Sequence, residues 1–147
     1  MSQHPAEAVS PSGIHHVRLT VTDIDRSKAF YRTLLGMEPA IDESAAVDEP
    51  GVREDPSRFY GGSIFSFGHQ LLGLRPVAEA GDTFSSTRVG LDHVSLLVES
   101  RSDLDKAAAR LEADGVPHGE VTDIGPMTIL SLQDPDGINL ELCCPIG

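Results

Sequence analysis

The chain contains two copies of one pattern, and this repeat limits the possible folds more than any other feature of the sequence. IHHVRLTVTDIDRSKAFYRTLLGMEP near the start matches LDHVSLLVESRSDLDKAAARLEADGVPHG in the second half. The match places His16 on His93 at a constant offset of 77 (93 − 16), and Gly36 on Gly115 after a two-residue insertion. Each copy reads as a strand, a turn, a helix and a glycine stop, so the sequence predicts a duplicated structural unit.

Local signals within each copy support this interpretation. Aliphatic residues alternate with the histidine and other polar residues in the strand part, so period two places each histidine on the face opposite the aliphatic side chains. Asp23 or Asp25 can cap the first helix, and Ser102 with Asp105 resembles a capping box for the second. The two glycines are typical of helix ends.

Three further apolar runs follow each helix and read as strands. They span residues 37–41, 63–67 and 70–75 in the first half, and 116–121, 128–132 and 138–143 in the second. One helix covers only one face of such a βαβββ sheet, so the two units are expected to pair. We therefore predict an α+β fold in which tandem βαβββ modules form a half-barrel cleft of mixed sheet.

The predicted organisation is a single domain. A flexible tail over residues 1–12 precedes module one (13–76), a linker (77–89) and module two (90–147). An acidic, proline-containing insertion over residues 42–60 interrupts module one and is expected to be either a rim of a site or a solvated loop.

Composition narrows the range of partners. The 147 residues are 39% hydrophobic and 23% charged, which is typical of one globular domain. A net charge of −12 without a basic block argues against nucleic acid or anionic lipid as a partner. Since no run approaches the ~20 apolar residues of a membrane span and no leader is evident, we expect a cytoplasmic protein. Cys143 and Cys144 are adjacent, which favours reduced thiols.

Three side chains are predicted to bind a metal. His16 and His93 occupy the same repeat position, and Glu141 lies on the face of the last strand opposite its leucines. Two imidazoles and a carboxylate are a ligand set for a divalent ion with open positions, and they suit iron, manganese, nickel and zinc equally. A single strand histidine is more often a hydrogen-bonded structural residue. The repetition of a histidine at the equivalent position of both copies favours the metal-binding interpretation.

The strings HHVRLTVTDIDRSKAFYRTLLGM, GLDHVSLLVES and DPDGINLELCCP resemble the vicinal oxygen chelate superfamily of glyoxalases, bleomycin-resistance proteins and extradiol dioxygenases. The resemblance extends from Gly13 to Pro145 and implies a glyoxalase-like fold with the same three metal ligands. Gly73 stands where four-ligand members carry a carboxylate or amide, which makes glyoxalase and epimerase activities less expected. Water or His69 is then the candidate for that position.

The function implied is a metal-dependent enzyme whose ion chelates vicinal oxygens of a small substrate, in dioxygenase, lyase, isomerase or transferase chemistry. Arg18 and Arg75 are candidate clamps for a substrate oxyanion, and Phe67 is a candidate apolar wall. Solvation of the arginines and core packing of the phenylalanine are the simpler interpretations. The alternative function is a metal-free drug- or metabolite-binding protein. In either case we expect a homodimer, whose partner covers exposed sheet edges.

Overall fold

The computed structural model describes residues 6–146 and contains two mixed four-stranded sheets, ordered β1-β4-β3-β2 and β5-β8-β7-β6. The first module comprises β1 (His16–Thr20), α1 (Ile24–Leu35), β2 (Ile41–Asp42), β3 (Ser63–Phe67) and β4 (Gln70–Arg75). The second comprises β5 (Val94–Leu97), α2 (Arg101–Ala113), β6 (Thr122–Asp123), β7 (Met127–Gln133) and β8 (Asn139–Pro145). The predicted α+β fold of tandem βαβββ units is confirmed.

The two sheets repeat the same strand pairing. In each module the first strand runs parallel to the last, and the other neighbours are antiparallel. Arg18 pairs with Gly73 in the first sheet, and Ser95 pairs with Glu141 in the second. Because Ser95 is the repeat equivalent of Arg18, the register confirms that Gly73 and Glu141 occupy equivalent positions.

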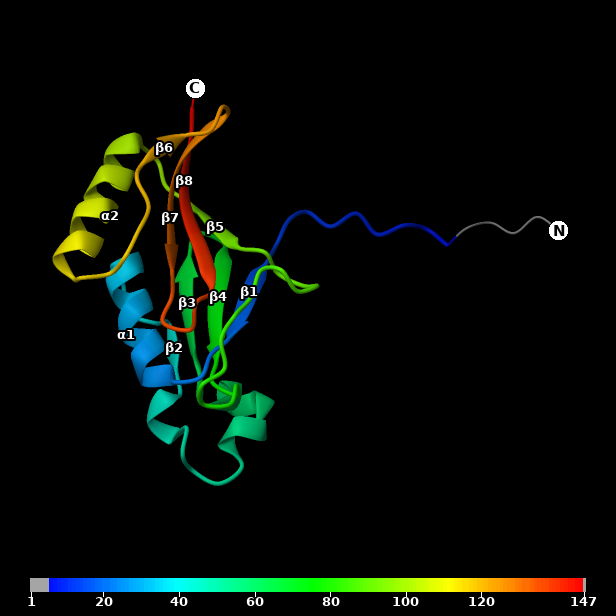
Figure 1. Ribbon diagram of the computed structural model, residues 1–147. Helices are drawn as coiled ribbons and strands as arrows, with labels where there is room; N and C mark the ends of the chain where they lie inside the picture. Colours follow the sequence, from blue (N-terminus) through cyan, green and yellow to red (C-terminus); the bar gives the residue numbers. More distant parts are fainter. Residues whose placement is uncertain (1–5, 147) are drawn as a thin grey trace.

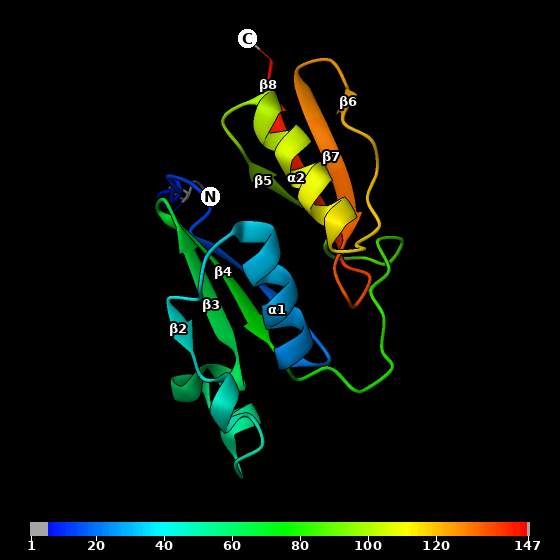
Figure 2. The ribbon, with the colours of Figure 1, turned by 90° about the vertical axis from the view of Figure 1, so that its left-hand side faces the viewer.

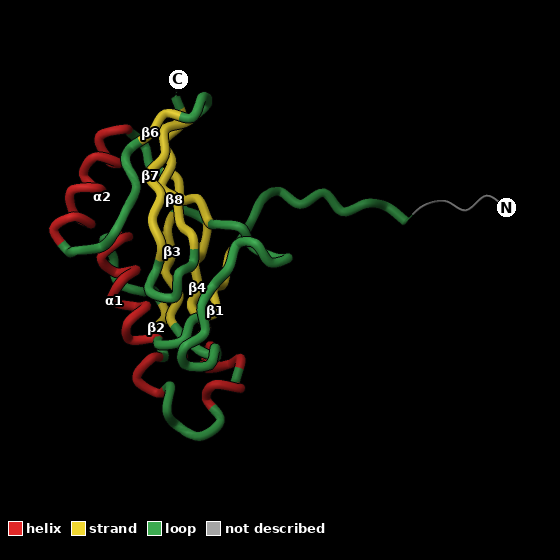
Figure 3. Tube along the Cα trace, in the orientation of Figure 1, coloured by secondary structure: helices red, strands yellow, loops and turns green. Residues whose placement is uncertain are grey.

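Both helices lie on the same side of the strand layer (Figures 1 and 3). In the view turned by 90°, α1 lies over the first sheet and α2 lies over the second (Figure 2). The alternating apolar residues of the strands face the helices and form the core, in which Leu19, Leu74, Leu130 and Leu140 are at most 2% exposed. The opposite face of both sheets, here called the open face, carries the polar positions of the same strands, including His16, Arg18 and Glu141.

The helix boundaries follow their capping residues. Asp23 accepts hydrogen bonds from the backbone N–H groups of Asp25 and Arg26, as predicted for α1. The capping box of α2 consists of Ser100 and Asp103, so its assignment to Ser102 and Asp105 was wrong. The helix begins at Arg101, two residues earlier than expected, which puts Ser100 at the N-cap and Asp103 at the third helical position.

The helices end where the sequence predicted. Gly36 at the end of α1 has φ 65°, and Gly115, just after α2, has φ 70°. This left-handed conformation costs glycine little, which is why glycine is frequent after a helix.

Two predicted strands are much shorter than the apolar runs indicated. Of the predicted 37–41 run only Ile41 is in β2, and the 116–121 run is replaced by β6 at Thr122–Asp123. Pro39 and Pro117 lie inside these runs and cannot donate a ladder hydrogen bond, which restricts pairing at a sheet edge. The insertion after β2 folds into three short 3₁₀ helices, at Ser44–Ala46, Val52–Glu54 and Pro56–Gly61.

A buried polar joint connects the modules. The Tyr31 hydroxyl of α1 donates to Asp134 Oδ2 at 2.8 Å, and Asp134 lies in the turn between β7 and β8. Asp136 of that turn accepts from the Thr22 backbone N–H at 3.1 Å and from Arg26 at 3.0 Å. Burial raises the pKa of Asp134, although hydrogen bonds from Ile138, Tyr31 and Asp136 oppose that rise. Burial and the nearby Asp134 charge also raise the pKa of Tyr31.

The predicted tail over residues 1–12 lies partly outside the described residues. Its described part, residues 6–12, is exposed, has no regular secondary structure and extends away from the sheets (Figure 1). Neither helix in the described part of the chain has the length and apolar character needed to cross a bilayer.

Candidate functional site

His93 and Glu141 form the best-defined part of the site. His93 immediately precedes β5, and Glu141 lies on the open face of the neighbouring strand β8. His93 Nε2 is 3.8 Å from Glu141 Oε2, and the glutamate side chain is only 14% exposed. Two ligand atoms on one ion, each bound at about 2.0–2.2 Å, lie about 3.0–3.5 Å apart, so this pair is a few tenths of an ångström wider than a ligand pair.

Asp92 orients the His93 ring. Its carboxylate oxygen lies 2.7 Å from His93 Nδ1. An ionised carboxylate can only accept, so Nδ1 carries the proton and donates, and the lone pair of Nε2 is directed to the Glu141 side. A carboxylate behind a ligating histidine is the usual outer-shell arrangement of protein metal sites.

His16 begins β1 on the open face, as predicted, and its Nδ1 lies 2.9 Å from His15 Nδ1. His16 and His93 line one cleft of about 310 Å³ between β1 and β5. Phe67 of β3 and Leu72 of β4 contribute apolar walls to the same cleft. The structure therefore brings two predicted ligands and the predicted apolar wall to one cavity.

The three predicted ligands do not converge on one point. Across residues 6–146, no three His, Cys, Asp or Glu side chains are grouped closely enough to hold a metal ion. The donor set nevertheless fits a divalent cation, because Glu141 is a nearly buried carboxylate next to an imidazole nitrogen that is free to coordinate. The third ligand, His16, stays a prediction.

Gly73, the first-module counterpart of Glu141, supplies no donor atom for a metal ion. Gly73 pairs with Arg18, and a Cβ atom at Gly73 would meet the Cγ and Nε atoms of Arg18 at 3.5 Å. The Arg18 side chain thus occupies the space next to Gly73. His69 lies in the turn between β3 and β4 and is exposed, which favours the solvated interpretation of this residue.

Arg18 and Arg75 gather around one aromatic ring. The guanidinium carbon of Arg75 lies 3.8 Å from the centre of the Tyr60 ring, and that of Arg18 lies 5.6 Å from it. Tyr60 belongs to the last 3₁₀ helix of the insertion, so the insertion contributes a wall to the open face. Arg75 and Tyr60 also line a surface pocket of about 680 Å³.

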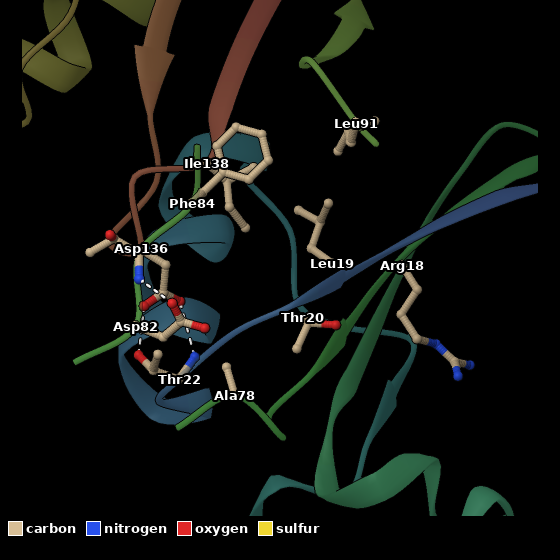
Figure 4. Close-up of a pocket in the computed structure, with 11 residues that line it drawn as sticks. Arg18, Leu19, Thr20, Thr22, Ala78, Asp82, Phe84, Leu91, Asp136 and Ile138 are labelled. Carbon is tan, nitrogen blue, oxygen red and sulfur yellow. Dashed lines mark hydrogen bonds between the residues drawn. The ribbon is translucent and has the colours of Figure 1, made fainter. Parts of the chain in front are cut away.

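A separate pocket of about 300 Å³ lies between the modules, where Leu19, Phe84 and Ile138 supply apolar walls. Phe84 of the linker donates its backbone N–H to the Asp136 carbonyl at 3.0 Å. Figure 4 shows the Arg18 side chain directed away from these residues. Leu19 and Arg18 therefore project to opposite sides of β1, and the guanidinium belongs to the open face.

Sequence reasoning missed Asp92 and Tyr60. Asp92 is adjacent to His93, and a carboxylate next to a candidate ligand was a usable signal. Tyr60 lies in the insertion outside the repeat, so neither periodicity nor the internal alignment could connect it with two arginines on β1 and β4.

Comparison with known proteins identifies the architecture. Residues 13–142 match the model of the Glyoxalase/Bleomycin resistance protein/Dioxygenase superfamily. A glyoxylase/bleomycin resistance protein/dioxygenase domain from Frankia sp. EAN1pec is 29% identical, with a TM-score of 0.73, and the match covers 93% of this chain and 100% of that chain. A search of curated proteins found no match.

Two other solved structures share the fold. A lactoylglutathione lyase from Agrobacterium tumefaciens is 23% identical with a TM-score of 0.64, covering 90% of this chain and 93% of its own. A fosfomycin resistance protein from Listeria monocytogenes is 15% identical with a TM-score of 0.66, covering 93% of this chain and 94% of its own. At these identities the likeness concerns the fold alone.

Proposed function

The chain belongs to the Glyoxalase/Bleomycin resistance protein/Dioxygenase superfamily, and we propose that it is a metal-dependent enzyme acting on a small molecule. His93, Glu141 and His16 would hold one divalent ion where the cleft between β1 and β5, which contains His16, adjoins the pocket that contains Glu141, since His93 lines both. The observation that carries the proposal is the arrangement around His93, whose Nδ1 is engaged by Asp92 while Nε2 is 3.8 Å from Glu141. A hydrogen-bonded structural histidine would not need a nearly buried carboxylate on its other nitrogen.

When bound, such an ion supplies Lewis acidity to two adjacent oxygens of the substrate. The chain's own residues bind and orient around that centre. Asp92 fixes the ring and tautomer of His93, and the low exposure of Glu141 keeps bulk water from its carboxylate. Phe67 and Leu72 give the cleft an apolar side, which removes water from the substrate's hydrocarbon part.

Lyase, isomerase, transferase and dioxygenase chemistry all suit three protein ligands, and the choice depends on the metal. Iron would favour chemistry with dioxygen, whereas manganese, nickel or zinc would favour the others. Elemental analysis of the protein purified without chelator therefore addresses both the presence of a site and the reaction class.

The decisive experiment compares metal content in the wild type and in variants. We expect close to one equivalent of a divalent metal in the wild type, or saturable uptake of one added equivalent. His93→Ala should lose most of it, since removing one ligand of three leaves a weak site. His118→Gln is the matched control, because His118 is hydrogen-bonded to Glu112 and to the Gly119 carbonyl on the outside of the second module. Full occupancy in His93→Ala would contradict the assignment.

Asp92→Asn separates positioning from ligation. It retains all three proposed ligands but removes the carboxylate that orients His93, and outer-shell changes of this kind typically weaken metal affinity about 10- to 100-fold. An affinity equal to the wild type would show that the Asp92 contact plays no part in metal binding.

A second candidate function is metal-free binding of a small molecule in the same cleft. The contact between His16 and His15 favours it, because His16 then makes a hydrogen bond to His15 rather than completing a metal site with His93 and Glu141. Less than a tenth of an equivalent of metal in the wild type, with no uptake of added divalent ions, would support this candidate against the enzyme.

A further inference from the structure

We propose that Arg18, Tyr60 and Arg75 form an anion-binding subsite on the open face of the first module, so that the ligand of the adjacent cleft carries a carboxylate, phosphate or phosphonate group. This inference deepens the proposed function and rests on it for the role of the ligand as a substrate. The subsite itself can be tested without a metal.

Arg18 and Arg75 lie together without a carboxylate partner among the described residues. Arg88, Lys106 and Arg110 also form no ion pair there, but they do not share an aromatic ring with another cation. The protein carries a net charge of −12, and six other basic residues pair with carboxylates: Arg26, Lys28, Arg32, Arg53, Arg58 and Arg101. Within residues 6–146, neither Arg18 nor Arg75 forms an ion pair. Glu54 and Glu79 line the same pocket as Arg75 without pairing with it. Two unneutralised guanidinium groups are thus held together in an acidic protein.

Tyr60 explains how the two cations are held together. Its ring stacks on Arg75 at 3.8 Å and lies 5.6 Å from Arg18, and the negative face of an aromatic ring attracts a cation without neutralising it. A carboxylate in the same place would have cancelled the charge. Planar guanidinium groups stacked in this way keep their N–H edges available for two-pronged hydrogen bonds to an oxyanion.

Arg75 also retains an unused donor. Its Nε atom is buried and has no hydrogen-bond partner among the described residues. Buried donors are nearly always satisfied, and exceptions occur where a ligand completes the contact. An oxyanion bound by Nε and a terminal nitrogen of Arg75 would satisfy this donor once the guanidinium turns its covered edge toward the ligand.

The backbone that carries Tyr60 is strained. Phe59 and Tyr60 have φ values of 51° and 60°, and they are the two non-glycine residues with positive φ in the described part of the chain. Aromatic residues rarely adopt this conformation, and such strain is concentrated at ligand-binding sites. Buried neighbours hold the turn in place, because Gly61 packs against Val47 and a Cβ at Gly61 would lie 2.8 Å from the Val47 Cα.

The separation between the subsite and the proposed metal-binding residues indicates how the charged groups of the small molecule are spaced. Arg18 lies two residues after His16 on the same face of β1, which corresponds to about 7 Å along the strand. Arg75 pairs with Thr20, two residues further along. The ligand would present vicinal oxygens near the histidines and an anionic group one or two strand repeats away, with its middle part lying along the Arg18 side chain that fills the space next to Gly73.

The test uses the full-length chain labelled with ¹⁵N and kept in a metal chelator at low ionic strength. Inorganic phosphate and acetate are titrated in separate experiments, and the arginine Nε–H signals are followed by NMR. We expect saturable shifts of the Arg75 and Arg18 signals. Tighter binding of phosphate would indicate a phosphate or phosphonate group in the natural ligand, and tighter binding of acetate would indicate a carboxylate.

Variants locate the effect. Arg75→Gln and Arg18→Gln should each weaken anion binding at least about tenfold, while Arg88→Gln, which changes an exposed linker arginine, should bind as the wild type does. Tyr60→Leu should weaken binding, whereas Tyr60→Phe, which retains the ring, should not. Arg18 is exposed, so its variant serves if Arg75→Gln fails to fold.

The proposal is overturned if neither anion gives a saturable shift by about 50 mM, or if Arg75→Gln and Arg18→Gln bind within about twofold of the wild type. Because the titrations contain a chelator, their outcome is independent of metal content. Anion binding in a protein that takes up no metal would keep the subsite and remove the proposed enzyme. Metal uptake without anion binding would do the opposite.

Discussion

Replacing Tyr31 by phenylalanine tests whether the polar joint between the modules stabilises the fold. The Tyr31 ring is fully buried, so the variant keeps the packing and removes only the hydroxyl that donates to Asp134 Oδ2 at 2.8 Å. Asp134 is 5% exposed, and its other oxygen accepts from the backbone N–H groups of Asp136 and Ile138. The variant therefore leaves one oxygen of a buried carboxylate without its hydroxyl donor.

The expected loss is about 2 kcal/mol of unfolding free energy near pH 7, because hydrogen bonds to charged groups contribute about 1.5–3 kcal/mol. In a chain of this length that corresponds to a fall in Tm of about 4–8 °C. Urea unfolding, followed by circular dichroism, measures the change, and an unaltered m-value would show that the native fold is kept. Tyr60→Phe is the matched control, since Tyr60 is the chain's other tyrosine and its hydroxyl makes no hydrogen bond within the described residues.

The pH dependence of the loss provides a second check. Burial raises the pKa of Asp134 in the native state, so ionising this carboxyl reduces native stability as the pH rises from 3.8 through the raised value. The Tyr31 bond opposes that rise, and its removal enlarges the loss at neutral pH. The difference between Tyr31→Phe and the wild type should therefore shrink as the pH is lowered from about 7 to about 4. A loss below about 0.5 kcal/mol at pH 7, or one that grows on acidification, would refute this account of the joint.

Three further predictions concern stability and assembly. Partial burial acts to raise the pKa of Asp42, but hydrogen bonds from Ser44, Lys28 and Ser63 outweigh it and lower the pKa to about 2, so Asp42→Asn should cost about 1 kcal/mol near pH 7 after solvent screening. That cost should disappear as the pH falls from 3.8 through about 2, as acid titration of both proteins would show. Gly62→Ala should cost at least about 2 kcal/mol in urea unfolding, because its Cβ would overlap the Leu74 carbonyl oxygen, whereas Gly13→Ala, with open space around it, should be neutral. Light scattering at micromolar concentration should give twice the chain mass of 15.7 kDa, and a monomeric mass would contradict the expected homodimer.

The internal repeat was sufficient to predict the fold because each copy specifies the same pairing. A strand that begins at a histidine, a helix that ends at a glycine and a final strand parallel to the first are readable from period two, period 3.6 and turn residues. The edge strands were not readable in this way. Met37, Val116 and Val121 pack against the core, but a proline interrupts each run. Pairing is therefore limited to Ala40 and Ile41 with Ile64 in the first run and to one bridge between His118 and Leu132 in the second.

The candidate site was predictable only where the repeat carries it. His93 and Glu141 lie on adjacent strands because β5 pairs with β8, and that pairing follows from the duplicated unit. The relation of His16 to this pair depends on how one module sits against the other. The joint in which Tyr31 donates to Asp134 and Thr22 donates to Asp136 connects the modules, and these partners are more than a hundred positions apart and show no shared period. Tyr60 escaped prediction for the same reason, since the insertion has no counterpart in the second copy.

The duplicated register also shows how the two copies have diverged. At one equivalent pair of positions the second module carries Ser95 and Glu141, whereas the first carries Arg18 and Gly73. Each pair combines one large charged side chain with one small residue, but the charge has opposite sign and sits on the opposite strand of the pair. A carboxylate at this place favours a cation, and a guanidinium favours an anion. If both proposals hold, the two modules bind different parts of the same ligand. The second module would hold the ion that chelates the ligand's oxygens, and the first would hold the ligand's negative charge.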